Sequence, residues 1–232
     1  MSVTTKWIEI ASADGGFGAY LAVPHVGKGP GIVLIQEIFG VNEHIRAVAE
    51  QYAADGYTVL VPDLFWRSAP RIELGYADAD WKTAVGLMHA LDADKALSDI
   101  ALTTATLRAL PGADGKIAAL GYCMGGLFAY RALAAGLVDT AVAYYGGGIQ
   151  NQLALAERIK GPLLMHFGAE DAHISAAAVQ AIAERFEDNA EVEIHVYPGA
   201  GHGFNCNHRS SYHQRAAAEA HGNSLTFLAD SM

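Results

Sequence analysis

Residues 116–126 read KIAALGYCMGG, and this stretch decides the fold class of the chain. The apolar run from Lys116 to Tyr122 is typical of a strand buried on both faces of a parallel sheet. Glycines then surround Cys123 in the pattern G-x-C-x-G, and a helical pattern follows. A strand that turns this sharply into a helix needs glycines, because side chains there would collide with the neighbouring strand or helix. The stretch predicts a central strand, a strained turn with Cys123 at its tip, and a helix.

The same alternation of strand and helix extends in both directions from this turn. Further apolar runs predict strands at Gly31–Gln36, Tyr57–Pro62, Thr140–Tyr145, Pro162–Gly168 and Glu191–Tyr197. Helical patterns lie at Ile45–Asp55, Asp94–Leu110, Gly125–Ala135, Ser175–Glu187 and Ser211–Ala229. Strict alternation predicts an α/β fold with a doubly wound, mostly parallel sheet and helices on both faces. Two strand-like runs before the first helix, Lys6–Ile10 and Ala19–Val23, predict an antiparallel edge.

Composition and charge indicate a folded protein and disfavour nucleic acid and membranes as partners. The chain has 232 residues, of which 52% are hydrophobic and 17% charged, so it can bury a sizeable core. The net charge of −10 disfavours nucleic acid as a partner, because an acidic surface repels phosphates. The N-terminal MSVTTKWIEI does not resemble a signal peptide, and no apolar run reaches the length of a membrane span. We therefore expect a cytoplasmic protein with reduced thiols and no cofactor.

One irregular region interrupts the alternation. No linker divides the chain, so we predict a single domain over residues 1–232. Residues 66–93 follow the Tyr57–Pro62 strand without a clear pattern. Such insertions often cover the ligand crevice at the carboxyl ends of the strands, and the alternative is a surface excursion without a role. We call residues 66–93 the cover segment.

Partners for a nucleophile at Cys123 follow two of the predicted strands. Asp171 lies on the loop after Pro162–Gly168, and His202 lies in the sequence GAGHGF after Glu191–Tyr197. The order nucleophile, acid, histidine is the one that the G-x-[SC]-x-G turn uses. His202 would then take the thiol proton while Asp171 holds the imidazole in place. Glu170 is the competing acid, interpreted as a solvated loop carboxylate. His173 is interpreted as an ordinary loop residue, and the alternative is that it lines the site.

The loop after Gly31–Gln36 supplies further candidates. In this architecture one oxyanion donor is a backbone N–H of that loop and the other follows the nucleophile, which nominates Ile38 and Met124. Glu37 is unusual there, since a carboxylate repels a thiolate. We therefore expect Glu37 to deprotonate or orient the thiol, and the alternative is an exposed loop acid.

Metal and redox roles for the same region are alternatives. His202, Cys206 and His208 lie close in sequence, but their spacing is not a standard zinc pattern, so we expect no metal. A different class of function is a thiol redox sensor or binding module, in which Cys206 resolves an oxidised Cys123.

At this point the sequence resembles the dienelactone hydrolases, also called carboxymethylenebutenolidases. The similar segments are QEIFGVN at 36–42, GY-VLVPDL at 56–64, GKI-ALGYCMGG at 115–126, YYG at 144–146 and AGHGF at 200–204. The resemblance implies a monomeric α/β-hydrolase that opens a lactone or enol ester, although a dimer is an alternative. It implies a triad of Cys123, Asp171 and His202, with Glu37 helping to generate the thiolate. It also implies that Ile38 and Met124 are the oxyanion donors.

The substrate pocket departs from the family pattern. Known members bind the substrate carboxylate with two arginines, one in the cover segment and one just past the catalytic histidine. Here the second place holds Cys206, and Arg209 comes three residues later. The cover segment offers Lys82, and no arginine lies between Arg71 and Arg108. A lysine lacks the bidentate fork of arginine. A larger, less anionic ester, a thioester or an activated phosphate ester is therefore an alternative substrate. Candidate pocket residues are Trp66, Trp81, Lys82, Tyr145, Phe204 and Cys206.

Overall fold

The computed structural model describes residues 3–232, and the chain divides into two compact units, Met1–Ile117 and Ala118–Met232. We call them unit 1 and unit 2 and describe each by itself. That residues 1–232 form a single domain stays a prediction. Among the described residues, no helix combines the length and the apolar composition that a membrane-spanning segment needs.

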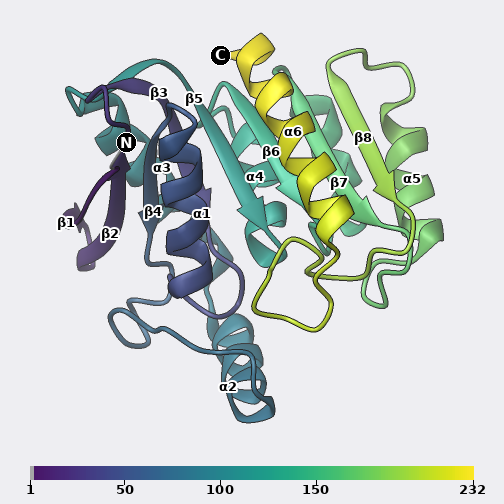
Figure 1. Ribbon diagram of the computed structural model, residues 1–232, viewed down its shortest axis with the longest axis horizontal. Helices are drawn as coiled ribbons and strands as arrows, with labels where there is room; N and C mark the ends of the chain where they lie inside the picture. Colours follow the sequence, from purple (N-terminus) through teal and green to yellow (C-terminus); the bar gives the residue numbers. More distant parts are fainter. Residues whose placement is uncertain (1–2) are drawn as a thin grey trace. The chain divides into compact units, whose positions relative to one another are not determined.

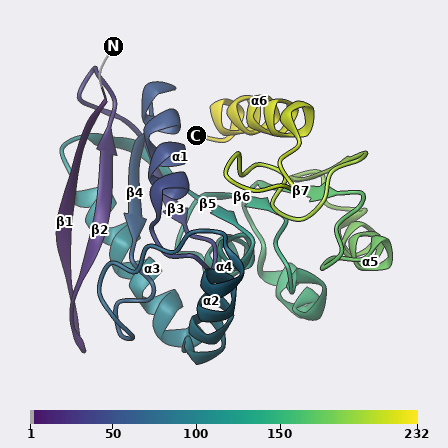
Figure 2. The same ribbon diagram turned by 60° about the horizontal axis from the view of Figure 1, so that its bottom comes forward.

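Unit 1 contains four paired strands in the order β1-β2-β4-β3 (Figure 1). Their bounds are β1 Thr4–Ser12, β2 Gly15–Val23, β3 Gly29–Ile35 and β4 Thr58–Pro62. β1 pairs antiparallel with β2, β2 antiparallel with β4, and β3 parallel with β4, which confirms the antiparallel edge. Helices α1 (Glu43–Ala54) and α3 (Ala93–Ala109) pack against these strands from opposite sides (Figure 2).

Unit 2 contains parallel strands in the order β5-β6-β7-β8. β5 (Ala113–Tyr122) begins in unit 1 and continues into unit 2, followed by β6 (Thr140–Tyr144), β7 (Leu163–Gly168) and β8 (Val192–Tyr197). Helix α6 (Gln214–Ser231) lies on one side of these strands, and α4 (Met124–Ala134) and α5 (Ala176–Phe186) lie on the other (Figure 2). Two short 3₁₀ helices follow β6, at Ile149–Asn151 and Leu153–Arg158. Parallel pairing confirms the predicted α/β class.

The cover segment is more regular than its sequence indicated. It contains helix α2, Asp78–Ala90. Two acidic residues, Asp78 and Asp80, stand in the first turn, where the helix dipole favours negative charge. Only Ala84 of this helix is buried, although Trp81, Ala84, Val85 and Met88 recur at the spacing of one helical face. The expectation of an irregular cover segment therefore missed a helical pattern that the segment carries.

The strand-to-helix turn after β5 depends on Gly121. A Cβ atom built on Gly121 would collide with the backbone carbonyl of Gly125. This contact comes from the first turn of α4 lying directly over the end of β5. Backbone atoms cannot move aside as a flexible side chain can, so only glycine is compatible with the turn.

We expect Gly121→Ala to lower the free energy of unfolding by about 1–3 kcal/mol, the usual cost of forcing an extra carbon into a packed site. The matched control is Gly222→Ala in the same unit. Gly222 lies in α6 with open space around its Cα, so alanine there should raise the free energy of unfolding by about 0.5–1 kcal/mol. Urea denaturation measures both, and equal stabilities of the two variants would contradict the steric argument.

Candidate active site

Cys123 stands at the tip of the turn between β5 and α4. Its backbone has φ 55° and ψ −116°, and it is the N-cap residue of α4. The Cys123 N–H donates to the carbonyl of Tyr144 at 3.0 Å, and the Cys123 carbonyl accepts from the N–H of Gly126 at 3.0 Å. A non-glycine residue in this conformation costs about 1–3 kcal/mol, so the surrounding hydrogen bonds must hold it.

The three residues that the sequence nominated as a triad lie in contact within unit 2. His202 Nε2 is 3.1 Å from Cys123 Sγ, and His202 Nδ1 is 2.8 Å from Asp171 Oδ2. The other oxygen of Asp171 accepts the backbone N–H groups of His173 at 2.7 Å and Ile174 at 3.1 Å. These residues follow β5, β7 and β8, and they meet because the carboxyl ends of parallel strands share one edge of the sheet.

Hydrogen bonds and charge stabilise the protonated form of His202. Burial alone lowers the pKa of His202, but the hydrogen bonds and charges of Asp171 and Cys123 outweigh burial and raise it to about 10. Burial raises the pKa of Asp171, yet the hydrogen bond from His202, its charge and two backbone N–H groups bring that pKa below its ordinary value. Both shifts describe one state, an imidazolium between a carboxylate and a sulfur atom. That state favours transfer of the thiol proton to His202.

Aromatic rings hold the His202 imidazole from two sides. Tyr145 contacts it edge to face with ring centroids 5.1 Å apart, and His173 does so at 4.9 Å. Phe204 is fully buried and supports Tyr145 at 5.3 Å. The sequence nominated Tyr145 and Phe204 for the pocket, but it interpreted His173 as an ordinary loop residue. His173 is instead an exposed neighbour of the histidine, brought there by the turn that its own N–H makes with Asp171.

Arg209 lies nearer to His202 than its place in the sequence suggests. Successive turns link Gly203 to Cys206, Cys206 to Arg209 and Arg209 to Tyr212 through backbone hydrogen bonds. They fold the chain back, so that a Cβ atom on Gly203 would collide with the guanidinium of Arg209. Gly203 directly follows His202. Cys206 itself is fully buried, and Cys123 and Cys206 are both free thiols.

Met124 and Ile38, the nominated oxyanion donors, occupy different units. Met124 is the first residue of α4, so its N–H has no acceptor within the helix. Ile38 is buried on the loop after β3 in unit 1. The structure describes their positions, and the oxyanion role itself stays a prediction.

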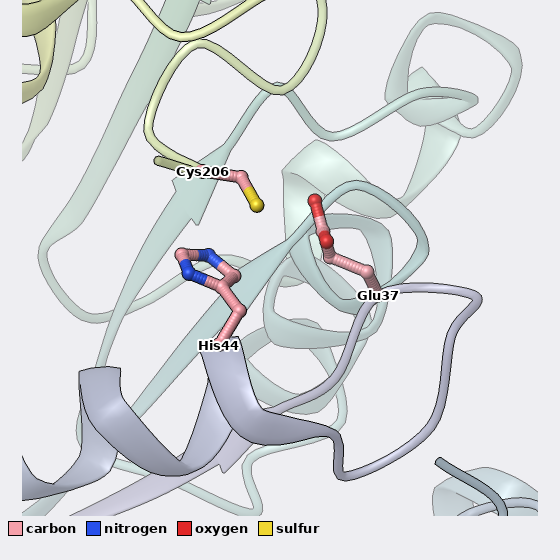
Figure 3. Close-up of side chains that lie close together, drawn as sticks. All are labelled: Glu37, His44 and Cys206. Atoms are coloured by element: carbon pink, nitrogen blue, oxygen red, sulfur yellow. The ribbon is translucent and has the colours of Figure 1, made fainter. Parts of the chain in front are cut away.

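Glu37 is fully buried on the same loop, so its interpretation as an exposed loop acid is wrong. The Tyr76 hydroxyl lies 3.3 Å from Glu37 Oε2. A ring nitrogen of His44, in the first turn of α1, lies within 4.8 Å of a Glu37 carboxylate oxygen (Figure 3). The sequence did not single out Tyr76 or His44 as neighbours of this carboxylate. One is distant along the chain and the other belongs to a helix, so no local motif joins them to Glu37.

The remaining candidates for the pocket lie in the cover segment of unit 1. Trp66 stacks on Phe17 at 5.9 Å and donates its indole N–H to the buried carboxylate of Asp99 at 2.9 Å. These contacts anchor the start of the cover segment to β2 and α3. Trp81 is 36% exposed and contacts Phe39, and Lys82 is exposed on α2.

Comparisons with known proteins agree over almost the whole chain. The family model described as "Dienelactone hydrolase family" matches residues 17–232. A carboxymethylenebutenolidase of Pseudomonas putida is 38% identical over 227 residues, covering 97% of this chain and 96% of that protein. Carboxymethylenebutenolidase 1 of Cupriavidus pinatubonensis is 34% identical over 224 residues, covering 96% of this chain and 95% of that protein.

A solved structure agrees with the sequence comparisons. The crystal structure of a protein described as a dienelactone hydrolase, from Klebsiella pneumoniae subsp. pneumoniae, superposes with a TM-score of 0.87 at 28% identity and covers 99% of both chains. The predicted fold class and the resemblance are both confirmed. The chain belongs to the dienelactone hydrolase family and has its α/β-hydrolase fold.

Proposed function

We propose that this hydrolase opens a small lactone or ester through an acyl-cysteine formed at Cys123. The observation that carries the proposal is the pair of contacts made by His202, 3.1 Å to Cys123 Sγ and 2.8 Å to Asp171 Oδ2. A thiol in contact with an imidazole that a carboxylate supports is the arrangement that nucleophilic catalysis needs. The names of the relatives support a lactone as the substrate class.

In the proposed reaction, the Cys123 sulfur attacks the carbonyl carbon of the substrate while His202 holds the former thiol proton. The tetrahedral intermediate then breaks its bond to the ring oxygen, and His202 returns the proton to that leaving oxygen. Water attacks the resulting thioester, and His202 takes up one of its protons. The carboxylic acid leaves, and Cys123 is restored. Asp171 stays ionised throughout and stabilises the imidazolium.

Two groups complete the proposed site. The backbone N–H groups of Met124 and Ile38 are the proposed donors to the negative oxygen of the intermediate. Glu37 is the proposed carboxylate that bears on the thiol proton, as the resemblance to the family implies. We propose the cytoplasm as the location, a reducing compartment in which Cys123 and Cys206 would stay as thiols.

The position of Arg209 is the basis for a proposal about the charge of the substrate. Its guanidinium lies against Gly203, the residue after His202, so a cation lies beside the nominated triad although Cys206 occupies the expected arginine position. A guanidinium can bind a carboxylate with two parallel hydrogen bonds. We therefore propose a lactone that carries a carboxylate. The larger, less anionic ester is the alternative that a substrate series tests.

We expect Cys123→Ala to lower hydrolysis of p-nitrophenyl acetate by at least about a thousandfold, because the nucleophile is lost. Mass spectrometry of the quenched reaction should find an acetyl group on the peptide containing Cys123. The same adduct should form in Cys206→Ala and be absent from Cys123→Ala. Unchanged turnover of pure Cys123→Ala would show that another group is the nucleophile.

We expect Asp171→Asn to move the pKa of His202 from about 10 toward or below its ordinary 6.5, because burial then acts with less opposition. Histidine NMR titration measures this. The raised pKa of His202 stabilises the fold fully below pH 6.5, and this stabilisation is lost as the pH rises through 10. The lowered pKa of Asp171 stabilises the fold above pH 3.8. The stability lost in Asp171→Asn should therefore be largest between about pH 3.8 and pH 6.5 and should shrink as the pH rises toward 10.

The matched control for Asp171→Asn is Glu170→Gln, which removes the same charge from the adjacent, exposed residue. This variant should leave the His202 titration where it is. A fall of the His202 pKa in Glu170→Gln, and not in Asp171→Asn, would reverse the assignment of the acid.

We expect Arg209→Gln to raise KM about tenfold for a lactone that carries a carboxylate, the size of a hydrogen bond to a charged group. KM for the corresponding neutral methyl ester should not change. Arg215→Gln is the control, because Arg215 is exposed and pairs with Glu219 on α6. If the wild-type enzyme prefers the neutral ester and Arg209→Gln behaves as Arg215→Gln, the substrate is the less anionic alternative.

A further inference from the structure

A tyrosine of the cover segment contacts the buried carboxylate of Glu37. Tyr76 lies two residues before α2, and its hydroxyl is 3.3 Å from Glu37 Oε2. Glu37 is fully buried, and a buried carboxylate needs hydrogen bonds to stay ionised. Tyr76 is only partly buried, so the hydroxyl reaches inward from the surface of unit 1.

The direction of this hydrogen bond follows from Asn42. The Asn42 side-chain oxygen accepts the backbone N–H of Ile45 and so caps α1, which leaves its amide nitrogen facing the cover segment. That nitrogen donates to the Tyr76 hydroxyl at 3.1 Å and to the carbonyl of Leu74 at 3.0 Å. An amide nitrogen can only donate. The tyrosine oxygen therefore accepts from Asn42, and its single proton is directed at Glu37.

The backbone of the cover segment is held against the loop that carries Glu37. Gly40 forms a bridge with Glu73, and the N–H of Leu74 donates to the carbonyl of Phe39 at 2.9 Å. The rings of Phe39 and Tyr76 pack edge to face at 4.6 Å. Gly40 has φ 81°, and a Cβ there would collide with the carbonyl of Ile72, so the two segments approach as closely as glycine allows. The Tyr76 hydroxyl is thus held in place from both sides.

We infer that Tyr76 is a positioning residue, which keeps the Glu37 carboxylate ionised and fixed in direction. The inference rests on the proposed function, in which Glu37 bears on the proton of the nucleophile. A hydroxyl that donates to a carboxylate stabilises the ionised form and restricts its rotation. The cover segment then contributes to the chemistry through Tyr76, in addition to any contact with substrate. His44 is a further titratable side chain of unit 1 that lies beside Glu37.

The test is a double-mutant cycle of Tyr76→Phe and Glu37→Gln, with kcat and KM measured on one lactone. Tyr76→Phe removes one oxygen atom from a partly buried ring, so the fold should persist, and thermal unfolding verifies it. We expect kcat to fall about tenfold with KM unchanged, the effect of losing one hydrogen bond to a charged group. In the Glu37→Gln background, Tyr76→Phe should have no further effect, because its target has lost its charge.

The matched control is Tyr20→Phe. Tyr20 of β2 donates to the carboxylate of Glu50 at 2.6 Å, so this variant removes the same type of hydrogen bond elsewhere in unit 1. It should leave kcat unchanged. Three outcomes would overturn the inference. They are a rise in KM alone in Tyr76→Phe, separate falls in kcat that add up in the double variant, and a wild-type kcat in either Tyr76→Phe or Glu37→Gln. Cys123→Ala, assayed in parallel, separates the two proposals, since retained activity in that variant contradicts the proposed function itself.

Discussion

The backbone of this protein turns from strand to helix within one residue, at Cys123, and much of unit 2 depends on that turn. The φ of 55° at Cys123 is tolerated because Tyr144 and Gly126 bond its two peptide groups and because Gly121 leaves room for the first turn of α4. The constraint has a chemical consequence. A sulfur atom at the tip of a sharp turn stands at the N-terminal end of α4, where it lies 3.1 Å from His202 Nε2.

A chain of packed aromatic side chains orients the imidazole of His202. Tyr197 of β8 packs on Phe204 at 5.3 Å, Phe204 on Tyr145, and Tyr145 on His202. The hydroxyl of Tyr197 is hydrogen-bonded to His166 Nδ1 at 2.9 Å. His166 is fully buried, and because burial lowers its pKa, this imidazole stays neutral. His166 also bonds Ser224 of α6 at 2.9 Å. The side-chain polar atoms of Tyr197, His166 and Ser224 are hydrogen-bonded to one another, which makes this group of side chains rigid, and rigid surroundings help a proton-transferring histidine.

The cover segment has two distinct parts in unit 1. Its first part is anchored by Trp66 to Phe17 and Asp99. Its second part lies along the loop after β3 and brings Tyr76 to Glu37. Insertions after a strand often carry function because they tolerate change without disturbing the sheet. Here the insertion also supplies a hydrogen bond, from Tyr76 to the buried carboxylate of Glu37.

The strand-helix alternation, the elbow at Cys123 and the order of Cys123, Asp171 and His202 were all predictable from the sequence, because each depends on local periodicity or on the shared edge of parallel strands. Helix α2 was not predicted, although Trp81, Ala84, Val85 and Met88 recur at helical spacing in a helix of which only Ala84 is buried. The contacts of Tyr76 with Glu37 and of His173 with His202, and the return of Arg209 to Gly203, were not either. Sequence alone determined which groups follow which strand, because hydrophobic period and turn chemistry act over a few residues. Only the tertiary structure decided which side chains support those groups, because such contacts depend on how loops fold back in space, which no local pattern encodes.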